Sequence, residues 1–82
     1  MKKSEIVVGG VYTNKKGAVR KVIAMGPEYK LYDSQGNEEC LQYELLKGKK
    51  YPYAKDKNES GNQINNCTLT AFASWAKERT DI

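Results

Sequence analysis

The sequence contains no histidine, and its 82 residues include only two cysteines, two prolines and one tryptophan. Histidine is the most frequent general base and a common metal ligand, so its absence removes many kinds of catalytic site. Cys40 and Cys67 lack the paired spacing of a metal site and are too few for a disulfide framework. We therefore expect reduced thiols and neither a metal nor any other cofactor.

Long hydrophobic runs are also missing. Ile6, Val7 and Val8 form the only apolar run near the start, and two glycines follow it. Three residues are far fewer than a signal-peptide core or a membrane span requires. The sequence therefore predicts no membrane contact and a cytoplasmic location.

The motifs of an enzyme are missing as well. There is no nucleophile elbow and no glycine-rich phosphate motif that opens a helix. Glu38 and Glu39 are neighbours in a predicted strand, so their side chains point to opposite faces and cannot share one site. We predict a binding protein without catalytic residues.

Length and charge limit what such a protein does. One domain spanning residues 1–82 has a small core, and association of copies would bury more apolar surface, so we expect a homo-oligomer. Fourteen basic residues against ten acidic ones give a net charge of +4, which favours an anionic partner. Only Arg20 and Arg79 are arginines, and the lysines also serve solubility.

Turn chemistry predicts two β-hairpins. In the first, over residues 10–25, Asn14 suits the first turn position and Gly17 supplies a positive φ. The resulting register places Tyr12 opposite Arg20, so we expect a cation–π contact between their side chains. The second hairpin covers 28–46 around a turn at 33–36, and it places Tyr29 opposite Leu41.

The remaining segments are a lead-in strand, a loop and a helix. Residues 4–8 suit an edge strand or an extended lead-in. Periodicity is lost over 47–66, which predicts a long loop, with a short strand as an alternative from Gln63 to Cys67. Thr68 is a good N-cap for a helix over 69–79, whose apolar face contains Leu69, Phe72, Ala73 and Ala76.

These elements predict an α+β, mainly β fold. It is either a small antiparallel β-meander or an SH3-like, partly open barrel, with one C-terminal α-helix in both cases.

The candidate ligand-binding residues are cations, aromatic rings and amides. Arg20 and the lysines suit phosphate, the rings suit a base, and asparagine amides suit its polar edge. Each residue type also has a purely structural interpretation: a solvated linker for the loop, a rim of the core or a subunit contact for Trp75, and a partner of Tyr12 for Arg20. The candidates are Tyr12, Arg20, Lys49, Lys50, Tyr51, Tyr53, Asn65, Asn66 and Trp75.

Glycine, turn and aromatic positions across most of the chain resemble those of small proteins encoded by bacteriophages and prophages. The positions that carry this resemblance are Gly10, Tyr12, Asn14, Gly17, Arg20 and Val22, and then Cys67, Phe72, Trp75 and Ala76. The resemblance implies a phage origin and a β-meander closed by a C-terminal helix, often SH3-like. It also implies an anti-defence role, because some compact phage proteins of this kind trap cyclic-nucleotide immune signals and others inhibit a defence enzyme.

Three kinds of partner remain open at this point. The first is a cyclic nucleotide or another phosphate-bearing small molecule, trapped as in a sponge. The second is a host defence protein, and the third is single-stranded nucleic acid, either of which would cover a broader basic and aromatic surface. The size of the ligand separates the first from the other two.

Overall fold

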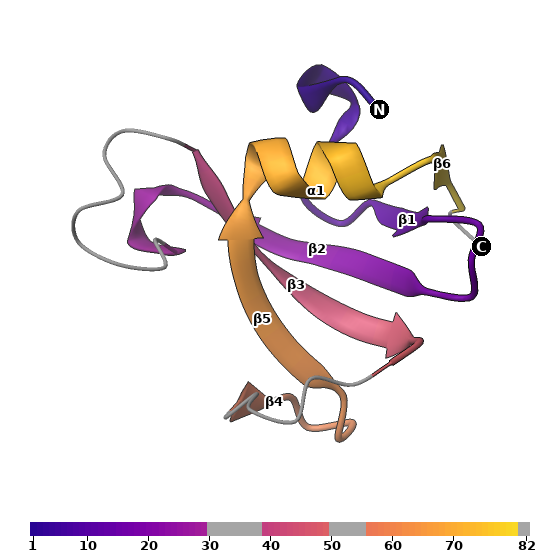
Figure 1. Cartoon of the computed structure of the whole chain (residues 1–82). Helices are drawn as coiled ribbons and strands as arrows, with labels where there is room; N and C mark the ends of the chain where they lie inside the picture. The colour runs from indigo at the N-terminus through magenta and orange to yellow at the C-terminus, as the bar shows by residue number, and fades with distance from the viewer. Residues whose placement is uncertain (30–38, 50–55, 81–82) are drawn as a thin grey trace.

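The computed structural model describes residues 1–29, 39–49 and 56–80. These residues form an antiparallel β-sheet with one helix, α1, lying across one of its faces (Figure 1). The strands are β1 (Val11–Thr13), β2 (Val19–Met25), β3 (Cys40–Lys47), β4 (Asp56–Lys57), β5 (Gln63–Thr68) and β6 (Glu78–Arg79). The helix α1 spans Leu69–Trp75, and the described residues also form two 3-10 turns, η1 (Lys3–Glu5) and η2 (Pro27–Tyr29).

The strand order is β4-β5-β3-β2-β1-β6, and each pair is antiparallel. The two-residue strands β4 and β6 form the two edges, so the sheet of the described residues is open and does not close into a barrel. The predicted α+β, mainly β fold with one C-terminal helix is confirmed.

The first hairpin has the predicted turn and register. Tyr12 lies opposite Arg20, and Val11 lies opposite Lys21. The Oδ1 atom of Asn14 accepts hydrogen bonds from the backbone N–H groups of Lys16 at 2.9 Å and Ala18 at 3.2 Å. Gly17 has a φ of +96°, which a residue with a Cβ atom rarely adopts. Local turn chemistry therefore sets the position of Arg20 in β2.

The predicted edge strand over residues 4–8 does not form, because Ser4 and Glu5 belong to η1 and Val8 lies in a turn. Ile6 between them has an extended backbone, as the alternative of an extended lead-in predicts. The Tyr12 hydroxyl accepts a hydrogen bond from the Val7 N–H at 2.9 Å and donates one to the Glu5 carbonyl at 2.7 Å. A buried side chain therefore satisfies backbone groups that a strand would have paired with a neighbouring strand.

The second hairpin differs from the prediction as well. Pro27 begins the 3-10 turn η2, so Tyr29 is not in a strand. Leu41 of β3 is opposite Met25 on β2 and Cys67 on β5. Both edges of β3 are therefore paired at Leu41, and Tyr29 cannot pair there. The predicted turn at 33–36 lies outside the described residues.

The predicted loop over 47–66 contains two strands, β4 and the first part of β5. The turn between them is fastened to β3 by Glu44, whose Oε2 atom accepts hydrogen bonds from the side-chain amides of Asn58 and, at 2.9 Å, Asn62. The alternative strand from Gln63 is confirmed and runs to Thr68. Residues 50–55 lie outside the described residues.

Helix α1 begins where the sequence predicts. The Thr68 hydroxyl accepts a hydrogen bond from the Ala71 N–H at 3.0 Å, which caps the first turn. The predicted apolar face is buried in the core, with Phe72 fully buried. Within the described ranges, no helix is long and apolar enough to cross a membrane.

The core combines residues of the helix, the sheet and the N-terminal segment: Ile6, Tyr12, Val22, Leu41, Tyr43, Leu69, Phe72, Ala73 and Ala76.

The helix ends at Trp75 and not at residue 79 as predicted. Ala76 has an extended backbone, and the N–H groups of Lys77 and Thr80 donate to β1 carbonyls at 2.9 Å and 2.7 Å. The side chains of Lys15 and Glu78 also form an exposed ion pair at 2.9 Å between the hairpin turn and β6. Pairing with the sheet edge therefore overrides the helix propensity of this charged segment.

Candidate functional site

Arg20 occupies the centre of the candidate site. It lies on β2, opposite Leu45 of β3 and Tyr12 of β1, so pairing on both sides holds its backbone. Its guanidinium carbon is 4.1 Å from the ring centroid of Trp75 and 4.6 Å from that of Tyr43. Both distances are typical of cation–π contacts. Two rings, one at the end of α1 and one in the sheet, therefore orient one cation.

Phe72 supports both rings. Its ring centroid lies 5.3 Å from that of Trp75 and 5.8 Å from that of Tyr43. Because Phe72 is fully buried, it joins the site to the core. The rings that contact Arg20 are thus held by packing as well as by the cation.

The predicted contact between Arg20 and Tyr12 is wrong, although their register is as predicted. The Tyr12 side chain is fully buried, and its ring centroid lies 5.6 Å from that of Phe72 in an edge-to-face arrangement. Both hydrogen bonds of its hydroxyl go to the backbone of the N-terminal segment. Tyr12 is therefore a core residue and is not available to a ligand.

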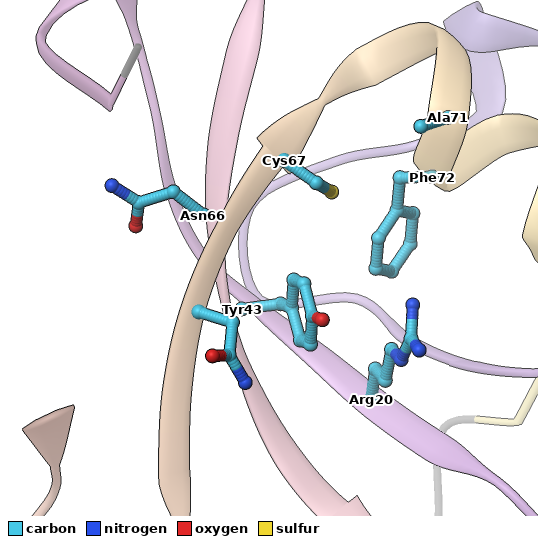
Figure 2. A pocket seen from close by; sticks show the side chains of 7 residues that line it. Arg20, Tyr43, Asn66, Cys67, Ala71 and Phe72 are labelled. Atoms are coloured by element: carbon cyan, nitrogen blue, oxygen red, sulfur yellow. The ribbon is translucent and has the colours of Figure 1, made fainter. Parts of the chain in front are cut away.

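A cavity of about 340 Å³ opens beside Arg20, between β5 and the helix (Figure 2). This volume is within the range of small-molecule sites, near its lower end. Among the described residues that line it none is acidic, and Arg20 is the one with a charged side chain. The lining residues are Arg20, Tyr43, Asn65, Asn66, Cys67, Ala71 and Phe72.

Two hydrogen-bond donors at this cavity have no partner among the described residues. They are the Nε atom of Arg20 and the Nδ2 atom of Asn65, and both are shielded from solvent. A buried donor without an acceptor costs about 1–3 kcal/mol. Arg20 lies on β2 and Asn65 lies on β5, and both of these strands pair with β3. The two donors therefore flank the same strand.

Asn66 lines the cavity but presents its side chain elsewhere. Figure 2 shows this side chain extending away from Arg20, on the other side of β5. Its Oδ1 atom accepts a hydrogen bond from Gln42 Nε2 at 3.3 Å. The alternation of side chains along a strand therefore separates Asn65 from Asn66.

The thiol of Cys67 points toward the helix side of the cavity (Figure 2). Burial raises the pKa of this thiol to about 11, although the Arg20 charge acts in the opposite direction. The thiol is therefore neutral at physiological pH and is a poor nucleophile. Cys67 thus contributes a small, weakly polar surface to the cavity.

Of the predicted site residues, Arg20, Asn65 and Asn66 line the cavity, although the Asn66 side chain extends away from Arg20, and Trp75 contacts Arg20 beside it. Lys49 is exposed beyond the end of β3 and is not among the described residues that line the cavity. Lys50, Tyr51 and Tyr53 lie outside the described residues.

Sequence reasoning missed Tyr43, Phe72 and Cys67 as cavity residues. The sequence predicts Phe72 on the apolar face of the helix, and both Phe72 and Tyr43 belong to the core, but they also form one wall of the cavity. The alternation of Leu41, Tyr43 and Leu45 in the sequence predicts only that Tyr43 lies on an apolar face of its strand. Only the pairing of β3 with β5 places it opposite Asn65.

Among the described residues, no group of three or more cysteine, aspartate or glutamate side chains is arranged to hold a metal ion. Comparisons with protein-family models, with curated proteins and with solved structures find no match to this chain. The site must therefore be interpreted from its own chemistry. It offers one fixed cation, an amide donor and an aromatic wall, which suit the binding of an anion.

Proposed function

We propose that this protein is a non-catalytic binding protein that captures a small anionic ligand of the nucleotide type in the cavity beside Arg20. One observation carries the proposal: the Nε atom of Arg20 and the Nδ2 atom of Asn65 are buried donors without an acceptor among the described residues. An anion supplies the acceptors that remove this cost. The rings of Tyr43 and Trp75 hold the cation in place for it.

The cavity favours a small ligand over a macromolecule. A volume of about 340 Å³ suits a ligand of the size of a nucleotide or part of a larger one. A host defence protein or a single strand of nucleic acid would instead need an extended surface. Capture, without chemistry, fits a thiol that stays neutral and a lining without carboxylates among the described residues.

The biological setting that we propose follows from the resemblance to phage proteins. In that setting the ligand is a nucleotide immune signal of the infected bacterium, and the protein removes it from the cytoplasm. The physical proposal of anion capture does not depend on this setting, and the two are tested separately.

Trp75 provides the test of capture, because it is the only tryptophan and contacts Arg20 directly. Its fluorescence is followed while the protein is titrated with cyclic dinucleotides, cyclic ADP-ribose isomers and short single strands. The proposal expects a saturable change with a small anionic nucleotide. A response to single strands alone, or to none of these compounds, contradicts it.

The setting is tested by purifying the protein from bacteria that make immune nucleotides. We expect an ultraviolet-absorbing small molecule to be released when the purified protein is denatured. Protein that binds nucleotides in titrations but carries none out of such cells would contradict the anti-defence setting and leave capture intact.

A further inference from the structure

We infer that the cavity recognises a singly charged phosphodiester through its two non-bridging oxygens, which the Nε–H of Arg20 and the amide of Asn65 bind, while the nucleobase adds little affinity. This inference rests on the proposed capture of an anion and names the chemical group that is captured. It follows from three features of the site: its occupied rings, its donors and its charge.

The aromatic rings are already occupied within the chain. Trp75 and Tyr43 each contact the Arg20 guanidinium and the Phe72 ring. A base that stacked on the ring faces that Arg20 covers would have to displace the guanidinium. Stacking on aromatic side chains is the sequence-tolerant source of base affinity, so a base gains little from ring faces that the guanidinium already covers.

The donors that remain are the edge of the guanidinium and the amide. Two rings contact the guanidinium, and the N–H groups in its plane are the donors that it offers a ligand. Nε makes no hydrogen bond to the described residues, so a ligand can accept one from its N–H without breaking an existing bond. Asn65, held by the β3–β5 pairing, supplies the second donor.

The charge of the lining distinguishes between classes of phosphate. Arg20 is the one charged side chain among the described lining residues, so it neutralises one negative charge. A phosphodiester carries one negative charge, whereas a phosphate monoester carries about 1.5 to 2 near pH 7. The additional charge of a monoester would lie unpaired in a partly desolvated site, which is costly.

The test is a calorimetric titration of the unaltered protein, up to millimolar ligand, with four probes. These are the 3′,5′-cyclic monophosphates of adenosine and uridine, adenosine 5′-monophosphate and adenosine. We expect the two cyclic compounds to bind within about threefold of each other, the 5′-monophosphate to bind at least about tenfold more weakly, and adenosine not to bind.

Two variants provide a matched pair. Asn65→Asp places a negative charge beside the phosphodiester, and we expect at least a tenfold loss of affinity for the cyclic compounds. Asn66→Asp makes the same change one residue along β5, where the side chain faces Gln42, and we expect affinity to change less than about twofold. Circular dichroism confirms that each variant is folded, and the probe series on the unaltered chain decides the question if Asn65→Asp is not.

Equal binding of the cyclic and the 5′-monophosphate, or a tenfold difference between the two bases, would overturn this inference and leave anion capture intact. Equal losses in Asn65→Asp and Asn66→Asp would overturn the role of Asn65. Failure of the protein to bind any phosphate compound would instead contradict the proposed function itself.

Discussion

The guanidinium carbon of Arg20 lies 4.1 Å from the ring centroid of Trp75, so a cation in the second strand contacts the last residue of the helix. This contact crosses the gap between α1 and the sheet at the edge of the cavity. Docking of the helix and orientation of the cation therefore depend on the same pair of side chains.

A double-mutant cycle measures this dependence. We expect Arg20→Met and Trp75→Leu to show a coupling free energy of about 0.5–2 kcal/mol in urea denaturation. This is the range of cation–π pairs from exposed to desolvated sites. The control cycle combines Arg20→Met with Ser74→Ala in place of Trp75→Leu. Ser74 is an exposed residue of the same helix, so this cycle should show no coupling. A coupling below about 0.3 kcal/mol between Arg20 and Trp75 would mean that the contact does not orient the cation.

Phe72 should be the most sensitive position in the helix. Its side chain is fully buried and contacts the rings of Tyr12, Tyr43 and Trp75. Phe72→Ala leaves a cavity in a small core, and we expect it to lower the free energy of unfolding by about 3–5 kcal/mol. Denaturant midpoints of this variant and of Ser74→Ala, which should differ little from the parent, provide the measurement. A loss below about 1 kcal/mol for Phe72→Ala would show that the helix docks through another face.

The thiol of Cys67 should make stability depend on alkaline pH. Burial raises its pKa in the folded state from 9.0 to about 11, so the folded state favours the neutral thiol. This contribution is fully present below about pH 9 and is lost as the pH rises toward 11, because the thiol of the unfolded chain ionises first.

We therefore expect the unfolding free energy of the parent to fall more steeply between pH 9 and 11 than that of Cys67→Ala. Below pH 8 the difference between the two proteins should be constant. Parallel curves up to pH 11 would show that the thiol is as well solvated in the folded state as in the unfolded chain.

Association remains a prediction, and the exposed valines before β1 show where to test it. Val7 and Val8 are 39% and 58% exposed, and Val8 borders a hollow of about 390 Å³ that Ile23 and Ile64 also line. We expect a dimer or larger oligomer at micromolar concentration by light scattering, and a shift toward monomer in Val8→Lys. Leu46→Lys, at an exposed apolar residue outside this hollow, is the control. A monomer mass for the parent throughout that range rules out the prediction.

Some features of the fold could be predicted because their causes are local. Asn14 and Gly17 form the first turn with their own side chain and backbone, and Thr68 caps the helix three residues away. The end of the helix could not be predicted in this way. Residues 77–79 have good helix propensity, and only the edge of β1, far away in the sequence, shows why they leave the helix.

The candidate site shows the same division. Arg20 was identified because arginine is rare in this chain and its place in the hairpin is fixed by the turn. The predicted contact of Arg20 with the Tyr12 ring is wrong. The register places Tyr12 beside Arg20, but it does not show that the Tyr12 ring enters the core. Tyr43 and Trp75 approach Arg20 through the pairing of β2 with β3 and the docking of α1, which depend on contacts distant in sequence.

Capture of an anion by Arg20 is tested by a calorimetric titration of the parent, Arg20→Ala and Lys49→Ala with 3′,5′-cyclic adenosine monophosphate. Arg20 is held by two rings at the cavity, whereas Lys49 is exposed outside it. We predict that Arg20→Ala weakens binding by about 1.5–3 kcal/mol, the range for hydrogen bonds to charged groups. Lys49→Ala should cost less than about 1 kcal/mol. A folded Arg20→Ala protein that binds as tightly as the parent would contradict anion capture by Arg20 and leave this residue with a purely structural role.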